Sequence, residues 1–153
     1  MWIRRLLTAS LLFNFAVTTV SAEWKVESVK DRMTDQKVSF AETRAKAEDA
    51  GVSARLLMVC DKGQRNFSLV LSSQFTRGRI GGEVRIDESG VSTPSIEVFA
   101  DPSRAYIISA PRFDVPSSAK RLRVRLRPTG GSELFYDFDL TGIAAARRQI
   151  GCP

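Results

Sequence analysis

The sequence predicts one mostly-β domain: a single-domain antiparallel β-sandwich of about seven to nine strands with a short C-terminal α-helix. Three observations predict this class. Short apolar or alternating runs recur along the chain and are separated by turn-forming residues. An Ala- and Arg-rich segment near the C-terminus is typical of a short helix. Two cysteines, Cys60 and Cys152, lie far apart in the sequence, at the ends of a predicted strand and of that helix.

The first half of the chain contains a predicted hairpin. Residues 24–29 alternate between apolar and polar side chains, and residues 38–41 form a second short strand. The polar segment 45–51 is expected to be a loop. Residues 55–60 form a continuous apolar run, as in a central strand, and residues 66–71 return after a short turn.

The middle of the chain contains three more short strands. Residues 78–82 include three glycines, so we expect a flexible segment there. Residues 83–87 alternate cleanly, with their two β-branched apolar residues facing inward. The apolar runs 95–99 and 105–108 are separated by an Asp-Pro turn signal.

Residues 121–127 and 133–140 are the clearest strands and predict a second hairpin. In the first of them every second residue is an arginine, and the residues between them are apolar. Guanidinium groups in a row can bind phosphate or carboxylate, so this face is a candidate ligand stripe. Its members are Arg121, Arg123, Arg125 and Arg127.

The second strand of this hairpin offers acids to the same face. Inward residues must face inward residues across the hairpin, which permits a register in which paired positions sum to 260. A second register, summing to 262, is also permitted. The first register pairs Arg127 with Glu133, Arg125 with Phe135, Arg123 with Asp137 and Arg121 with Asp139. The arginines therefore have two interpretations: a structural hairpin neutralised by its own acids, or a ligand stripe.

The cysteines predict one covalent link. Residues 143–150 are expected to be helical, and Gly151 would end the helix. Two cysteines allow a single intramolecular disulfide, Cys60–Cys152, which would attach that helix to the end of a central strand. Intermolecular or free thiols are the alternative, and the long separation lacks the spacing of a redox or metal-binding pair.

The N-terminus has the three parts of an export signal. Two arginines precede an apolar core at residues 6–17, and small residues end at Ala22. The expected organisation is a signal peptide at 1–22 and an exported domain at 23–153, periplasmic or secreted, with no membrane span after cleavage. Losing the two arginines and no acid lowers the net charge from +6 to +4, too little to indicate a nucleic-acid partner.

The composition argues against several chemistries. The chain has no histidine, which excludes Ser-His-Asp and Cys-His catalysis and imidazole metal sites. No phosphate-binding loop or nucleophile-elbow motif is present, so no cofactor, metal or catalytic residue is predicted. The remaining candidates for acid chemistry are Asp137 and Asp139, which share one strand face.

The order of several short landmarks carries a family resemblance. Trp24-x-Val26 opens the mature chain, an apolar strand ends in Cys60, and a Phe138-Asp-Leu-x-Gly142 segment leads to a short helix stopping at Cys152. In this order the chain resembles the VasI/TagO group of periplasmic proteins associated with type VI secretion, and related exported proteobacterial proteins of unknown function. The resemblance implies an exported β-rich accessory domain with the same cysteine link, and no catalytic residues.

These observations predict a non-enzymatic envelope accessory or binding module. Its expected partner is an envelope protein or a cell-wall component, and the resemblance implies a link to type VI secretion. One alternative is a cell-wall hydrolase that uses Asp137 and Asp139 with raised pKa values. Another is an inhibitor of lysozyme-type enzymes. This alternative is disfavoured because those targets are mostly basic and this chain is also basic, so the two would repel each other.

Overall fold

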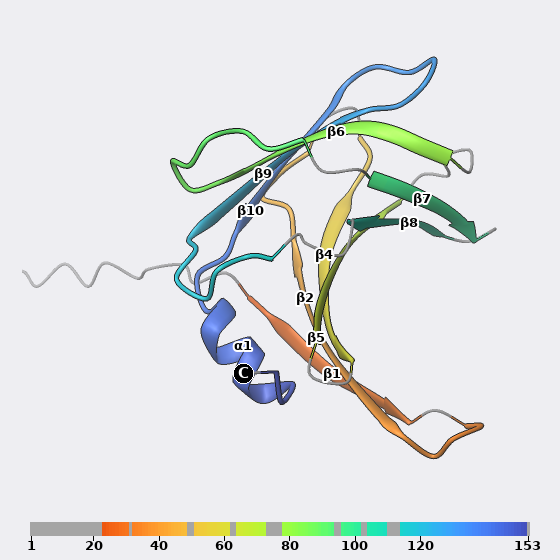
Figure 1. The fold of residues 1–153 in the computed structure, drawn as a ribbon, viewed down its shortest axis with the longest axis vertical. Coiled ribbons are helices and arrows are strands. Elements are labelled where there is room, and N and C mark those ends of the chain that lie inside the picture. The colour runs from red at the N-terminus through yellow and green to blue at the C-terminus, as the bar shows by residue number, and fades with distance from the viewer. Residues whose placement is uncertain are drawn as a thin grey trace, which may run out of the picture.

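A computed structural model gives the fold of the chain and describes residues 23–30, 32–48, 51–61, 64–72, 78–93, 96–101, 104–109 and 114–152. The predicted signal peptide, residues 1–22, lies outside the described residues, so it stays a prediction. The described part contains ten strands and one short helix (Figure 1). That helix has seven residues, and no described helix reaches the length and apolarity of a bilayer-spanning segment.

The predicted class, a mostly-β antiparallel sandwich with a short C-terminal helix, is confirmed. All pairings between named strands are antiparallel, in the order β1-β2-β4-β5-β8-β7-β6-β9-β10-β3. The elements are β1 (Lys25–Lys30), β2 (Lys37–Arg44), β3 (Ala47–Glu48), β4 (Ala54–Asp61), β5 (Gln64–Leu71), β6 (Gly78–Ile86), β7 (Ile96–Asp101), β8 (Arg104–Ser109), β9 (Arg121–Arg127), β10 (Leu134–Asp139) and α1 (Ile143–Gln149).

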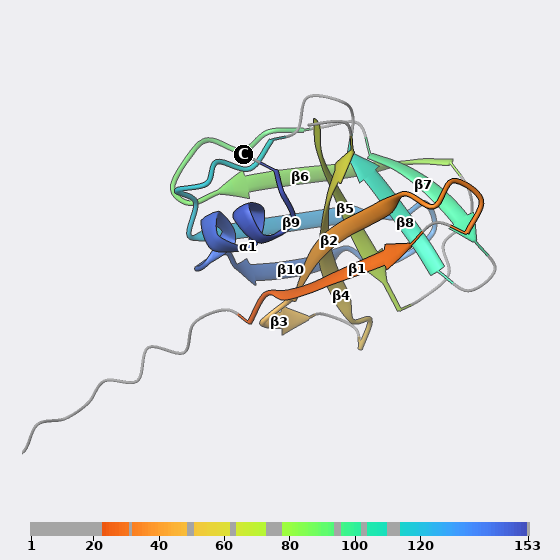
Figure 2. The ribbon, with the colours of Figure 1, turned by 90° about the horizontal axis from the view of Figure 1, so that it is seen from below.

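Strand β6 joins the two layers of the sandwich. Its residues 78–80 pair with β7, and its residues 81–86 pair with β9. The expectation of a flexible segment at 78–82 is therefore wrong, because hydrogen-bonded neighbours outweigh the low strand preference of glycine. The glycines instead mark the point where the strand changes partners. Figure 2 shows the result: β6, β9 and β10 run across β4 and β5.

The core lies between these two layers. From the layer of β4 and β5 it receives alternate residues such as Leu56, Met58 and Phe67, each at most 2% exposed. From β9 and β10 it receives the residues between the arginines and acids, among them Leu126 and Phe138, both fully buried. Because the apolar residues of β9 point inward, its charged residues must point outward.

The predicted hairpin of residues 55–60 and 66–71 is confirmed as β4 and β5. β4 is central, because β2 pairs with it on the other side. The expectation that residues 45–51 form only a loop is wrong, since β3 pairs there with β10. This pairing is set by a distant strand, so no local sequence pattern indicates it. It makes Lys46 a neighbour of β10, with its amide donating to the carbonyl of Asp137.

Helix α1 closes one side of the core next to β1 (Figure 1), and its end confirms the role predicted for Gly151. Gly151 has φ of 74°, a left-handed conformation that glycine adopts without strain. Its amide donates to the carbonyl of Arg148, and that of Cys152 donates to the carbonyl of Arg147. These two bonds form a Schellman motif, which turns the chain back toward β4.

The predicted disulfide between Cys60 and Cys152 is present, with the two Cα atoms 5.6 Å apart. Cys60 lies near the end of β4, and Cys152 is the second residue beyond the helix cap. A second contact holds the same helix: Arg147 is 5% exposed, donates to the carbonyl of Val115 and lies over the ring of Phe67. The helix is therefore fixed to the sandwich by one covalent bond and one buried arginine.

Candidate functional site

The outer face of β6, β9 and β10 carries the arginines that the sequence singles out. β9 lies between the other two strands, and its residues alternate between the core and solvent. The predicted ladder is therefore confirmed as a row on one face. Its four members are Arg121, Arg123, Arg125 and Arg127.

The strand register arranges the outward residues in rows. In the β9–β10 hairpin the register is the first of the two permitted by the sequence, with paired positions summing to 260. β6 adds a third residue to each row from the other side of β9. Two rows cross all three strands: Glu83–Arg125–Phe135 and Arg85–Arg123–Asp137.

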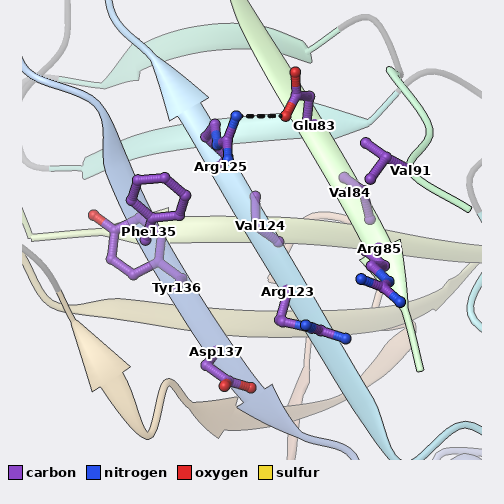
Figure 3. A pocket seen from close by; sticks show the side chains of 10 residues that line it. All are labelled: Glu83, Val84, Arg85, Val91, Arg123, Val124, Arg125, Phe135, Tyr136 and Asp137. Carbon is purple, nitrogen blue, oxygen red and sulfur yellow. Dashed lines mark ion pairs between the residues drawn. The ribbon is translucent and has the colours of Figure 1, made fainter. Parts of the chain in front are cut away.

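A pocket of about 400 Å³ opens over these two rows (Figure 3). We call it the outer-face pocket, and define it by the six outward residues of the two rows together with Val91. Val91 comes from the segment that follows β6. It is 60% exposed, and Phe135 is 41% exposed. The pocket therefore combines three guanidinium groups and two carboxylates with exposed apolar surface.

The first row holds Arg125 in a fixed position. Its guanidinium lies over the ring of Phe135, 4.8 Å from the centroid, as the sequence predicts. Its Nη1 is 3.0 Å from a carboxylate oxygen of Glu83, the ion pair drawn in Figure 3. Because the same side chain contacts a ring and an acid, it is less free to move than an ordinary surface arginine.

The two end members of the ladder bind acids and lie outside the pocket. The predicted pair of Arg127 and Glu133 is confirmed, with Nε 2.7 Å from the carboxylate, and Arg127 also contacts Glu83 at 2.8 Å. Arg121 donates to both carboxylate oxygens of Asp137, with its Nε at 2.8 Å and 3.0 Å. The candidate ligand stripe is therefore reduced to its two central arginines.

Two predicted ion pairs are wrong although the register is right. The sequence predicts that Arg121 pairs with Asp139 and that Arg123 pairs with Asp137. Arg121 instead reaches diagonally to Asp137, and Asp139 pairs with Lys46. Sheet twist brings diagonal neighbours within reach of long side chains, and the pairing of β3 with β10 supplies Lys46.

These contacts also set the ionisation of the two aspartates. Hydrogen bonds from Arg121 lower the pKa of the Asp137 carboxyl, although partial burial opposes the shift. Burial raises the pKa of Asp139, but hydrogen bonds from Lys46 and Thr141 outweigh it and lower the value to about 2. A general acid needs a raised pKa, so neither carboxyl is suited to that role.

The second row places two like charges side by side. Arg85 and Arg123 lie directly opposite each other on β6 and β9. Their guanidinium groups share the carboxylate of Glu88, which lies just beyond β6 and outside the pocket lining. The Nε of Arg123, like that of Arg125 in the first row, is buried and has no acceptor among the described residues. This row therefore has more donors than its acids satisfy.

Among the described residues, no group of three or more His, Cys, Asp or Glu side chains is placed to hold a metal ion. The cysteines are joined in the disulfide. A disulfide is compatible with an exported protein.

Three pocket residues are not identified by the sequence, namely Glu83, Arg85 and Val91. The alternation of residues 83–87 indicates that Arg85 faces outward, but not which strand lies beside it. Its neighbour, Arg123, comes from a strand much later in the chain. Val91 lies beyond the end of β6, where no periodic pattern assigns a direction.

Comparisons with protein-family models, with curated proteins and with solved structures find no match to this chain. The resemblance to the VasI/TagO group accordingly stays a prediction. The function has to be argued from the geometry of the outer face.

Proposed function

We propose that this protein is an exported, non-enzymatic binding module of the cell envelope whose ligand-binding surface is the outer-face pocket. The observation that carries the proposal is the pocket itself. A volume of about 400 Å³ lies in the range of small-ligand sites, and an exposed ring beside arginines offers both apolar and charged contacts. Such a surface suits recognition of one part of a larger partner.

The chemistry of the pocket favours binding over catalysis. Of its two carboxylates, Asp137 is held ionised by Arg121, and Glu83 is paired with Arg125 and Arg127. The chain contains no histidine to act as a general base. The lowered pKa of Asp137 and of Asp139 argues against the carboxylate-dependent hydrolase that is the main alternative.

The proposed compartment and partner follow from the N-terminus and the disulfide. An export signal at residues 1–22 would deliver the chain to the periplasm or beyond, where a disulfide persists. The partner is then an envelope protein or a cell-wall component. A role beside type VI secretion is the narrower form of this proposal. It rests on the landmark resemblance alone, and neighbouring secretion genes would support it.

A capture experiment with matched variants tests the proposal. Tagged residues 23–153 are incubated with a cell-envelope extract, using the native protein and two alanine variants. Phe135→Ala removes the exposed ring of the pocket, and Val29→Ala removes an exposed apolar side chain, 56% exposed, from β1. We expect the native protein and Val29→Ala to retain the same component, and Phe135→Ala to lose it.

Two results would contradict the proposal. In the first, the native protein retains no component under conditions that preserve known envelope complexes. In the second, Phe135→Ala retains the component as well as Val29→Ala does, which would place the binding surface elsewhere. Circular dichroism of both variants checks that they are folded, so that a loss of binding can be distinguished from unfolding.

A further inference from the structure

The pairing of β6 with β9 sets two arginines directly opposite each other. Like charges at directly opposed positions of an antiparallel pair repel and destabilise it. Arg123 also lies opposite Asp137 on its other side, but that carboxylate is engaged by Arg121. Asp137 still attracts Arg123 electrostatically, but among the described residues the group that forms an ion pair with both Arg85 and Arg123 comes from outside the three strands.

That group is the carboxylate of Glu88. One of its oxygens lies 2.7 Å from Nη2 of Arg85, and the other lies 3.3 Å from Nη2 of Arg123. The Glu88 side chain is 83% exposed. An ion pair made by so exposed a side chain is weak and easily exchanged with solvent.

Backbone carbonyl groups also hold the two arginines, independently of Glu88. The Nε of Arg85 donates to the carbonyl of Ser89 at 3.0 Å, and Nη2 of Arg123 donates to the carbonyl of Asp87 at 2.9 Å. These carbonyls belong to the turn that follows β6 and fix the direction of both guanidinium groups. Positions set by the backbone would persist if the Glu88 carboxylate moved away.

The other two acids that line the pocket form their ion pairs with other arginines. Glu83 is bound by Arg125 at 3.0 Å and by Arg127 at 2.8 Å. Asp137 is bound by Arg121. With Glu88 displaced, the two opposed guanidinium groups form a cationic site on the rim of the outer-face pocket, which both of them line.

We propose that Arg85 and Arg123 form a carboxylate-binding site that Glu88 occupies in the free protein and that the carboxylate of a ligand takes over. The bridging Glu88 carboxylate is itself the observation that identifies the ligand class, since it fits between the two groups. The rest of the ligand lies over Phe135 and Val91, so it needs an apolar face. This inference rests on the proposed function and names the ligand class of the same pocket.

Titration of residues 23–153 with benzoate, followed by amide NMR shifts, tests the site. Benzoate supplies a carboxylate on an apolar ring, and benzamide is its uncharged counterpart. We expect benzoate to shift amides of β6 and β9, and benzamide to bind at least about tenfold more weakly. Inorganic phosphate, run in parallel, reports whether the site prefers the planar carboxylate over another oxyanion.

Variants test whether Glu88 competes with the ligand for Arg85 and Arg123 or only stabilises the fold. Glu88→Gln keeps the shape of the side chain but removes its charge, so the side chain no longer competes for the two arginines. We therefore expect benzoate to bind at least about threefold more tightly to this variant than to the native protein. Arg85→Gln should weaken benzoate binding at least about tenfold. Arg148→Gln, which removes an exposed arginine of α1, should leave the affinity unchanged.

The proposal is overturned if benzoate binds neither the native protein nor Glu88→Gln, or if benzamide binds as well as benzoate. It is also overturned if Glu88→Gln binds benzoate no more tightly than the native protein, because Glu88 would then not be a competitor. Stronger binding of phosphate than of benzoate would contradict the carboxylate assignment. None of these outcomes depends on capture of an envelope component, so this inference can fail while the proposed function stands.

Discussion

At the scale of single residues, the exposure of the acid decides what each arginine of β9 can do. Arg121 is held by Asp137, whose side chain is only 24% exposed, whereas Arg123 is held by Glu88 at 83% exposure. We therefore expect the ion pair of Arg121 with Asp137 to persist and the ion pair of Arg123 with Glu88 to break more easily. The sequence predicts that these arginines face outward and that acids lie nearby. It predicts the pair of Arg127 with Glu133 but not the partners of Arg121 and Arg123, because sheet twist and a two-residue strand decide those.

Asp139 gives a prediction on acid stability. Its folded pKa of about 2 lies below the ordinary value of 3.8, so its contribution is present above about pH 4 and is lost as the pH falls through 2. That contribution is at most about 2 kcal/mol. Urea unfolding of Asp139→Asn should show a lower free energy of unfolding at pH 6 and a shallower loss between pH 4 and pH 2.

The matched control is Asp35→Asn, which removes a carboxylate 81% exposed on the β1–β2 hairpin. We expect that variant to follow the native pH profile closely. Equal pH profiles for Asp139→Asn and the native protein would show that the Lys46 and Thr141 contacts do not stabilise the folded state.

At the scale of elements, the end of α1 and the disulfide act together. The Schellman motif at Gly151 directs Cys152 toward Cys60, and the bond spans a sequence separation of 92 residues. The sequence predicts this link because the chain has two cysteines and a predicted export signal, and such a pair in an oxidising compartment usually forms a structural disulfide. It does not predict that Arg147, on the same helix, is buried against Phe67, since an arginine in an Ala-rich segment is usually at the surface.

Reduction of the disulfide should release α1 before the sheets. In the chain-entropy model a loop of this length stabilises the fold by roughly 4–5 kcal/mol at most. Hydrogen exchange after reduction should show amides of residues 143–152 losing protection first, while amides of β4, β5 and β9 stay protected. The melting temperature should fall.

A Cys60→Ser/Cys152→Ser variant serves as the control, because it should match the reduced native protein and not respond to reductant. A reduced protein with an unchanged melting temperature and an equally protected helix would contradict the attachment of α1 through this bond.

At the scale of the whole molecule, the path of β6 creates the site. This strand leaves the layer of β7 and joins that of β9 (Figure 1). Its register with β9 sets Arg85 opposite Arg123. The sequence predicts the β9–β10 register because a short loop and strict alternation limit the choices. It gives no such limit for β6 and β9, which are separated by two other strands. The half of the pocket that β6 supplies could therefore not be predicted from the sequence and is identified only by the structure.

The most direct test of the account is the footprint of a bound envelope component on the folded domain. Isotope-labelled residues 23–153 are titrated with size-fractionated soluble fragments of the cell envelope, and amide shifts are mapped residue by residue. The account predicts shifts concentrated on the outer-face pocket, at Glu83, Arg85, Arg123, Arg125 and Phe135. Shifts concentrated on the β1–β2 hairpin or on α1, with the pocket unaffected, would contradict it.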